Sequence, residues 1–241
     1  MTSASWIKDL PVAHRGYHDM NKTVWENTLS AFSRAAEAGF AIECDVQLAA
    51  DSVPVIFHDH DLERLCGIKG DIRERTSQEL AMLSVGGTTD KIPTLKTMLA
   101  LVAGKVPLVI EIKGRHAEDD GFVEAVLEDL EGYTGKVALM SFDHHILKDL
   151  KAAGASYPLG LTAEGSEPED FFRHDEAMQL GLDFVSYRHA HLPNSFITAR
   201  RQAGIPVITW TVRDENARAH TYTHADQMTF EGFDPRETAT T

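Results

Sequence analysis

Short apolar segments rich in β-branched residues alternate with amphipathic segments along most of the chain. Apolar runs between turn residues are typical of buried strands, and apolar positions three and four apart are typical of helices. The predicted strands are Pro11–His14, Ala41–Leu48, Val53–His58, Pro107–Lys113, Lys136–Ser141, Tyr157–Thr162, Asp183–Tyr187, Pro206–Val212 and Gln227–Glu231. The predicted helices are Thr28–Ala38, Thr94–Ala103, Gly121–Leu130, Ile146–Ala153, Pro168–Leu180 and Ser195–Ala203. This alternation indicates parallel strands joined by right-handed crossovers.

One connection in this series is too short for a crossover helix. The predicted strands Ala41–Leu48 and Val53–His58 are separated only by Ala49–Ser52, whereas a parallel pair needs a dozen or more connecting residues. We therefore expect an antiparallel hairpin here. A turn centred on the middle of the connection would place Glu43 opposite His58.

Once this accessory strand is set aside, eight parallel strands remain, which is the count of a (β/α)8 barrel. We therefore predict an α/β fold of the TIM-barrel type, with an accessory β-hairpin strand after strand 2. Residues 59–93 form a small insertion in this scheme. No Pro- or Ser-rich linker divides the chain, so residues 1–241 are expected to form a single domain.

Composition and charge narrow the class of partner. The chain has 241 residues, of which 43% are hydrophobic and 25% charged, and its formal net charge is -14. Such an acidic balance argues against a nucleic-acid partner, which requires a basic face. It does not argue against a small anionic substrate, because a local positive site can exist in an acidic protein.

Targeting and redox signals point to the cytoplasm. No run of about 18 apolar residues suggests a membrane span, and the first residues do not form a basic start followed by an apolar run. The two cysteines, Cys44 and Cys66, are interpreted as free thiols of a reducing compartment. We therefore expect a cytoplasmic protein without a membrane span.

Polar residues interrupt several predicted strands near their carboxyl ends. Glu43 and Asp45 are two positions apart, so their side chains share one face of a strand; Glu111 and Lys113 repeat this spacing. Because the carboxyl ends of barrel strands converge on one face, we expect a common mouth for a larger set: His14, Arg15, Glu43, Asp45, Glu111, Lys113, Trp210 and Glu231. His58 follows the accessory strand.

The residue types in this set indicate chemistry on phosphate. Three carboxylates suit one hard divalent cation such as Mg²⁺ or Ca²⁺, and that cation would offset the charges of Glu43 and Asp45. Arg15 offers a fork that fits phosphate oxygens. Two histidines can serve as general acid and general base. Together these groups indicate phosphoryl transfer or phosphodiester cleavage.

Structural roles compete with these interpretations. Glu43 and Asp45 could alternate on the surface of an edge strand, and Glu111 with Lys113 could be a plain ion pair. Trp210 is equally compatible with the core and with a wall of the substrate site. Metal-dependent amidohydrolases also use eight-stranded barrels, but their His-x-His pair would end the first strand, where this chain has His14 followed by Arg15 and Gly16.

Sequence motifs carry a resemblance to a known family. The segments AHRG, ENTLSAFSRAAEAGFAIECDVQLAADSVPVIFHD, IPTLKTML, LVIEIKG, SFD and WTV closely resemble the glycerophosphodiester phosphodiesterases, over almost the whole chain. The resemblance implies a (β/α)8 barrel that hydrolyses glycerophosphodiesters to glycerol 3-phosphate and an alcohol. It implies His14 and His58 as the acid–base pair, Glu43, Asp45 and Glu111 as metal ligands, Arg15 and Lys113 as phosphate-binding residues, and Glu26 as the residue that orients the arginine.

The resemblance also implies a mechanism and exposes one departure. One histidine would remove the proton of the glycerol 2-hydroxyl, which attacks phosphorus, and the other would protonate the leaving alcohol. A cyclic glycerol phosphate would form and then be hydrolysed. The family usually ends its last strand with a Thr-Asp pair, whereas this chain has MTFEGFDP. Glu231 either replaces that aspartate or marks a different leaving group, and with Trp210 it is a candidate for substrate contact.

Two alternatives to this function remain. The first is a lysophospholipase D or a sphingomyelinase D-like phosphodiesterase or lyase, which would need an apolar, membrane-facing rim. The second is a non-catalytic phosphodiester-binding barrel. A binder has no use for an acid–base pair, so the presence of both His14 and His58 argues against it.

Overall fold

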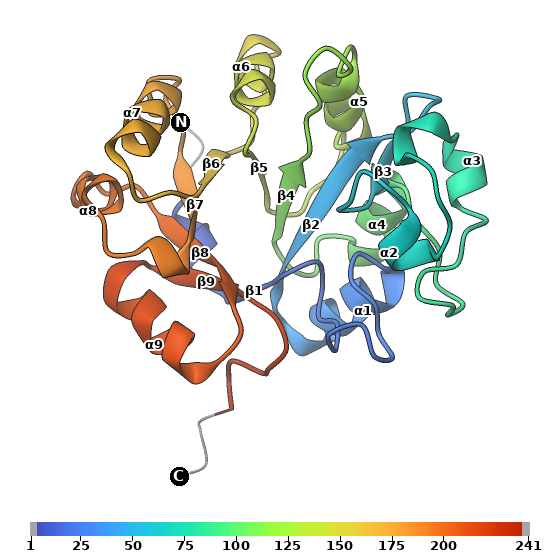
Figure 1. Ribbon diagram of the computed structural model, residues 1–241, viewed down its shortest axis with the longest axis horizontal. Coiled ribbons are helices and arrows are strands. Elements are labelled where there is room, and N and C mark those ends of the chain that lie inside the picture. Colours follow the sequence, from blue (N-terminus) through green and yellow to red (C-terminus); the bar gives the residue numbers. More distant parts are fainter. Residues whose placement is uncertain (1–3, 238–241) are drawn as a thin grey trace.

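The alternating strands close into a barrel in the computed structural model, which describes residues 4–237 (Figure 1). The strands are β1 (Val12–Ala13), β2 (Ala41–Leu48), β3 (Pro54–Ile56), β4 (Leu108–Ile112), β5 (Val137–Ser141), β6 (Leu159–Ala163), β7 (Phe184–Arg188), β8 (Val207–Val212) and β9 (Gln227–Phe230). β1 pairs in parallel with both β2 and β9, which closes the ring, and β3 pairs antiparallel with β2. The predicted (β/α)8 barrel with an accessory hairpin strand is confirmed.

Helices cover the outside of this ring (Figure 1). They are α1 (Leu29–Ala38), α2 (Glu63–Cys66), α3 (Ser77–Leu80), α4 (Leu95–Val102), α5 (Phe122–Asp129), α6 (His144–Ala152), α7 (Pro168–Met178), α8 (Ser195–Gln202) and α9 (Glu215–His224). Local sequence sets their ends. The Thr28 hydroxyl accepts a hydrogen bond from the Ala31 N–H at the start of α1, and Gly39 ends that helix in the left-handed conformation.

The structure differs from the sequence predictions at α9 and at the β2–β3 hairpin. The sequence pattern missed α9 because its only buried residue is Thr221, so it has no apolar stripe. In the hairpin, Val46 pairs with Ile56. This register is one residue away from the predicted one, so His58 is not opposite Glu43. The Ala49 N–H donates to the Val53 carbonyl at 3.0 Å, which moves the turn centre to Asp51.

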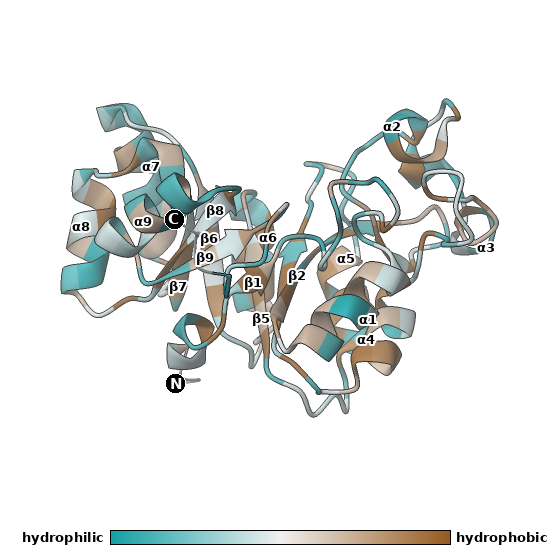
Figure 2. Cartoon of the chain, turned by 90° about the horizontal axis from the view of Figure 1, so that it is seen from below, coloured by the Kyte–Doolittle hydropathy of each residue, from teal (hydrophilic) through white to brown (hydrophobic). Residues whose placement is uncertain are grey.

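Apolar side chains fill the barrel interior below the carboxyl ends of the strands. This inner cluster contains Ala4, Ile7, Val12, Ala41, Val109, Ala138, Met140, Phe184 and Ile208. Gly160 makes room for the Phe184 ring, since a Cβ at that position would lie 2.3 Å from it. The segment next to the N-terminus lies below the barrel in Figure 2, on the side away from α2. Apolar side chains thus fill one end of the barrel, so polar site residues can lie only at the other end.

The insertion at residues 59–93 is small and has its own apolar cluster. That cluster includes Leu62, Leu65, Ile72, Leu80 and Val85, and Trp25 packs against it. Within residues 4–237 no helix combines the length and the apolar character needed to cross a bilayer. The assignment of residues 1–241 to one domain stays a prediction, because residues 1–3 and 238–241 lie outside the described part.

Candidate active site

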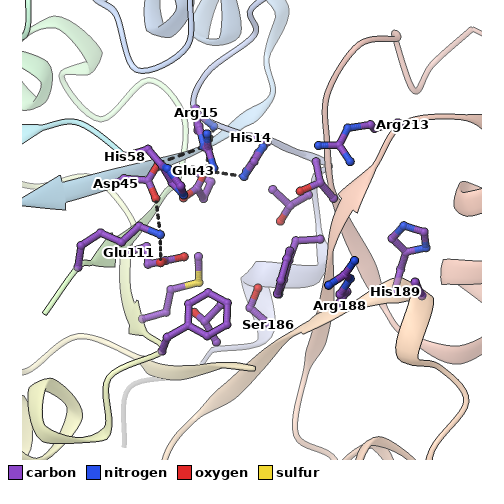
Figure 3. Close-up of a pocket in the computed structure, with 18 residues that line it drawn as sticks. His14, Arg15, Glu43, Asp45, His58, Glu111, Ser186, Arg188, His189 and Arg213 are labelled. Atoms are coloured by element: carbon purple, nitrogen blue, oxygen red, sulfur yellow. Dashed lines mark hydrogen bonds and ion pairs between the residues drawn. The ribbon is translucent and has the colours of Figure 1, made fainter. Parts of the chain in front are cut away.

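The carboxyl ends of the strands surround one cavity of about 330 Å³ (Figure 3). Most of the predicted site residues line it, namely His14, Arg15, Glu43, Asp45, His58, Glu111, Lys113 and Trp210. Two predicted residues do not line the cavity. Glu26 contacts Arg15, and Glu231 contacts His14. The predicted strand-end residues therefore meet at one mouth, with Glu231 next to its lining rather than in it.

A cluster of three carboxylates lies on one side of the cavity. Glu43 and Asp45 both project inward from β2, and the strand register places Glu111 of β4 beside Asp45. All three are buried, and one oxygen of each lies within 4.8 Å of the others. Burial, followed by the charges of Asp45 and Glu111, raises the pKa of Glu43 well above its usual value. The cluster offers hard oxygen ligands where a positive charge is favoured.

Two basic side chains reach into this acidic cluster. Lys113 pairs with Glu111, and its Nζ lies 3.1 Å from an Asp45 oxygen. The Nε of Arg15 lies 3.2 Å from the other Asp45 oxygen, and its Nη1 donates to Glu26 at 2.5 Å. Burial opposes the ionisation of Asp45, yet Lys113 and Arg15 hold its pKa below the usual range. Asp45 therefore carries its charge in the folded protein.

The backbone after β1 is shaped to hold Arg15. Arg15 itself has a φ of 54° and Gly16 a φ of 83°, both in the left-handed region. This turn lets the Arg15 N–H donate to the Glu43 carboxylate at 2.8 Å. A Cβ on Gly16 would lie 2.8 Å from the Cβ of Ala31, so only glycine fits. The His-Arg-Gly motif thus fixes the backbone and side chain of Arg15 on the acidic cluster.

Each of the two predicted histidines is held by a carboxylate at Nδ1. The Nδ1 of His14 lies 2.5 Å from a Glu231 oxygen, and the Nδ1 of His58 lies 2.7 Å from an Asp59 oxygen. Burial lowers the pKa of His14 although Glu231 acts in the opposite direction. Because a carboxylate at one ring nitrogen fixes the ring orientation, the Nε2 of each imidazole is the nitrogen that remains for a contact with a ligand.

Glu231 holds three basic groups. Besides His14, its carboxylate lies 3.5 Å from Nε2 of His18, and it accepts a hydrogen bond from Nε of Arg213 at 2.7 Å. Burial opposes its charge, but the hydrogen bond with His14 and the nearby basic groups of His18 and Arg213 keep the pKa of Glu231 below its usual range. In this structure Glu231 contacts His14, and its role as a substrate contact stays a prediction.

The sequence analysis did not single out Asn27, Asp59 or Arg64. Asn27, which follows Glu26, donates from Nδ2 to Asp45 at 2.9 Å. Arg64 of α2 donates to Asp59 through Nε at 2.6 Å and to Glu26 through Nη1 at 2.9 Å. The adjacency of Asp59 to His58 was a usable signal, whereas nothing local to Arg64 indicates its partners.

Arg64 thereby links Glu26, the partner of Arg15, to Asp59, the partner of His58. We expect Arg64→Gln to lower kcat by about 10–100-fold, the usual cost of losing an outer-shell partner, because Glu26 and Asp59 lose their common anchor. Arg115→Gln is the matched control, since Arg115 pairs with Asp71 at 2.8 Å and touches neither carboxylate. Steady-state kinetics and the unfolding temperature check this prediction. An equal loss of kcat in both variants would contradict it.

Comparisons with known proteins identify the family of this chain. The profile of the glycerophosphoryl diester phosphodiesterase family matches residues 14–232. A glycerophosphodiester phosphodiesterase of Caldanaerobacter subterraneus subsp. tengcongensis is 30% identical over 218 residues, which cover 86% of each chain. The crystal structure of a glycerophosphodiester phosphodiesterase from Thermotoga maritima is 28% identical, with a TM-score of 0.74 over 92% of this chain and 94% of that one.

A further structural relative is more distant in sequence. A phosphodiesterase of Oleispira antarctica, solved in complex with the product sn-glycerol-3-phosphate, has a TM-score of 0.83 over 94% of each chain at 23% identity. This likeness shows the barrel fold.

The closed barrel, its mouth and the family match together identify a hydrolase of phosphoric diesters. Imidazoles held by carboxylates, an acidic cluster and basic side chains meet in one cavity. Because the family profile covers most of the chain, the protein belongs to the glycerophosphoryl diester phosphodiesterase family. The family membership and enzyme class that the motifs indicated are confirmed.

Proposed function

We propose that this protein hydrolyses glycerophosphodiesters to glycerol 3-phosphate and an alcohol. The observation that carries the proposal is the pair of imidazoles, His14 and His58, each held at Nδ1 and each lining the cavity that contains the acidic cluster. Family membership supports the substrate class. The cytoplasmic location also stays a proposal; Cys44 and Cys66 are free thiols, as expected in a reducing compartment.

The carboxylates fit one divalent cation, Mg²⁺ or Ca²⁺. Glu43, Asp45 and Glu111 supply only oxygen ligands, their oxygens lie within 4.8 Å of one another, and all three are buried. Their mutual repulsion, seen in the raised pKa of Glu43 after the effect of burial, is the charge pattern that a cation relieves. When bound, such a cation neutralises the carboxylates and polarises a phosphate oxygen.

Arg15 and Lys113 are the proposed phosphate-binding residues. Glu26 and Asp45 fix the Arg15 guanidinium at the cavity, and that planar fork matches phosphate oxygens. Lys113 contributes a compact charge from the end of β4. Its present partners, Glu111 and Asp45, are proposed metal ligands, so we infer that its ammonium group turns to the phosphate when the site is loaded.

His14 and His58 are the proposed proton carriers. One imidazole removes the proton of the glycerol 2-hydroxyl as that oxygen forms a bond to phosphorus. The other donates a proton to the alcohol oxygen as its bond to phosphorus breaks, which yields a cyclic glycerol phosphate. Water then opens the cyclic diester, and the two histidines exchange roles, so glycerol 3-phosphate leaves and both rings return to their first protonation states.

The rim of the cavity favours this substrate class over a lysolipid or sphingolipid. Its exposed positions include the guanidinium groups of Arg188 and Arg213 beside one large apolar side chain, Phe142, whereas an enzyme that acts at a membrane surface would need an apolar rim. Co-sedimentation with liposomes tests the alternative, since a lipid-directed phospholipase D would bind them.

Turnover of defined substrates tests the proposed function. We expect glycerophosphocholine, glycerophosphoethanolamine or glycerophosphoglycerol to give equimolar glycerol 3-phosphate and free alcohol, with cyclic glycerol phosphate visible by phosphorus NMR. Reactions with Mg²⁺, Ca²⁺, Mn²⁺ or a chelator test the cation. Absence of turnover for every diester would overturn the proposal and favour a binding barrel. Undiminished turnover in chelator would remove the metal role alone.

A further inference from the structure

The carboxylates of the cavity lining are confined to one side, where Arg15 and Lys113 accompany them. Every carboxylate that lines the cavity comes from β2 or β4, in the acidic cluster. On the opposite side, the charged or titratable lining residues are all basic: Arg188, which ends β7, His189 after it, and Arg213 after β8. Figure 3 shows these three residues across the cavity from Glu43, Asp45 and Glu111. We call Arg188, His189 and Arg213 the basic half.

The arginines of the basic half are held by carboxylates outside the cavity lining. Arg188 pairs with Glu164 at 2.8 Å, and both side chains are about half exposed, at 47% and 46%. Such an exposed pair contributes little stability, since solvent screens it, so its guanidinium can turn to a ligand. Arg213 uses Nε and Nη2 on Glu231, which leaves Nη1. Both arginines can therefore donate hydrogen bonds into the cavity.

Below this rim the cavity floor carries hydroxyl groups without partners. Thr162 of β6, Ser186 of β7 and Thr229 of β9 line the cavity and are at most 2% exposed, yet none of their hydroxyls has a hydrogen-bond partner among the described residues. The indole N–H of Trp210 on β8 is likewise unpartnered. Because buried polar groups are normally paired, these four strands present hydrogen-bonding positions for a ligand.

The direction of the reaction assigns an occupant to this half. In phosphoryl transfer the attacking and leaving oxygens lie roughly in line on opposite sides of phosphorus. As part of this inference we assign the glycerol moiety to the side of the acidic cluster, next to Arg15 and Lys113, the proposed phosphate-binding residues. The leaving alcohol is then directed across the cavity, toward the unpartnered hydroxyls and the basic half.

Resting on the proposed function, we propose that the basic half and the floor beneath it form the leaving-alcohol subsite, and that this subsite selects an alcohol that carries both hydroxyls and an anionic group. A phosphorylated polyol satisfies both requirements: its hydroxyls meet Thr162, Ser186 and Thr229, and its anionic group meets Arg188 and Arg213. A quaternary ammonium alcohol would bring a positive charge against two guanidinium groups, which disfavours it.

A matched substrate pair isolates the anionic group. Glycerophosphoinositol and glycerophosphoinositol 4-phosphate differ only by one phosphate on the leaving alcohol. We expect kcat/KM to be at least about tenfold higher for the phosphorylated substrate, which corresponds to about 1.4 kcal/mol. The preference should shrink as KCl rises, because salt screens exposed charges.

Two variants should shift this ratio in opposite directions. Arg188→Gln removes one cation, so the ratio should fall by about threefold or more. Glu164→Gln frees Arg188 from its carboxylate, so the ratio should rise. Arg200→Gln is the control for a generic loss of charge, because Arg200 pairs with Asp175 at 3.2 Å and does not line the cavity. A general effect on folding would change the activity of all three variants in the same direction, and the unfolding temperature of each variant detects such an effect.

The outcomes separate this inference from the proposed function. A ratio near one or below one in the wild type, with both substrates hydrolysed, overturns the anionic subsite and leaves the diesterase activity standing. The same holds if Arg188→Gln and Arg200→Gln change the ratio equally. No hydrolysis of these substrates or of glycerophosphocholine overturns both proposals.

Discussion

Replacing either His14 or His58 with alanine is expected to lower kcat by about 10²–10⁴-fold, the usual contribution of a positioned general acid or base. The expectation follows from geometry. Glu231 holds Nδ1 of His14 and Asp59 holds Nδ1 of His58, while both rings line the cavity. Steady-state kinetics with a glycerophosphodiester measure the loss, and cation binding should survive in both variants.

The controls separate proton transfer from a general loss of structure. His60→Ala removes an exposed imidazole two positions from His58 and should leave kcat within about twofold, as expected for a surface substitution away from the site. Glu231→Gln keeps His14 but replaces the carboxylate that orients it, so we expect a smaller loss than for His14→Ala. Near-full turnover in His14→Ala or His58→Ala would show that the assigned proton carrier is wrong.

The second large effect concerns the acidic cluster. A divalent cation at about 100 times its Kd should stabilise the wild-type protein by about 2.7 kcal/mol, which raises the unfolding temperature by roughly 5–10 °C for a domain of this size. In Glu43→Gln and Asp45→Asn this cation-induced rise should shrink or vanish, and turnover should fall with it. Differential scanning calorimetry with Mg²⁺ or Ca²⁺ and with chelator provides a measure that does not depend on activity.

The unfolding temperature of the same variants without a cation gives a further prediction. Glu43 lies beside two other buried carboxylates, and burial and their charges raise its pKa. Without a cation, removing one of these charges relieves repulsion, so Glu43→Gln should unfold at a temperature no lower than that of the wild type in chelator. Glu124→Gln, an exposed position on α5, is the control and should keep the full cation response. A full response in Glu43→Gln would exclude Glu43 as a ligand.

Sequence patterns predicted the barrel well where burial is uniform. β2 is buried along its entire length and has the predicted bounds Ala41–Leu48. The prediction succeeded because Gly39 and the following turn mark both ends of a short apolar run, which is typical of a buried strand. The same reasoning failed for α9, whose helical character depends on the Asp214 cap and on tertiary contacts rather than on an apolar stripe. Hydrophobic periodicity therefore predicts the inner layer better than the outer one.

The candidate site was predictable at its strand ends and not beyond them. Glu43, Asp45 and Glu111 could be placed together because strands alternate their side chains and barrel ends converge. The partners of Glu231 come from the turn after β1 and from the end of β8, and their meeting depends on how separate loops pack. The link made by Arg64 is of the same kind. Contacts between loops carry no local periodicity from which they could be inferred.

The apolar filling of the lower barrel has a kinetic consequence. With Phe184, Ile7 and their neighbours occupying that end, we expect substrate, water and products to pass through the mouth that the described residues 4–237 form. The water needed for the second half of the reaction must arrive along the path by which the alcohol departs. Slow departure of a tightly held alcohol would therefore prolong the life of the cyclic diester, and the order of exit becomes part of the catalytic cycle.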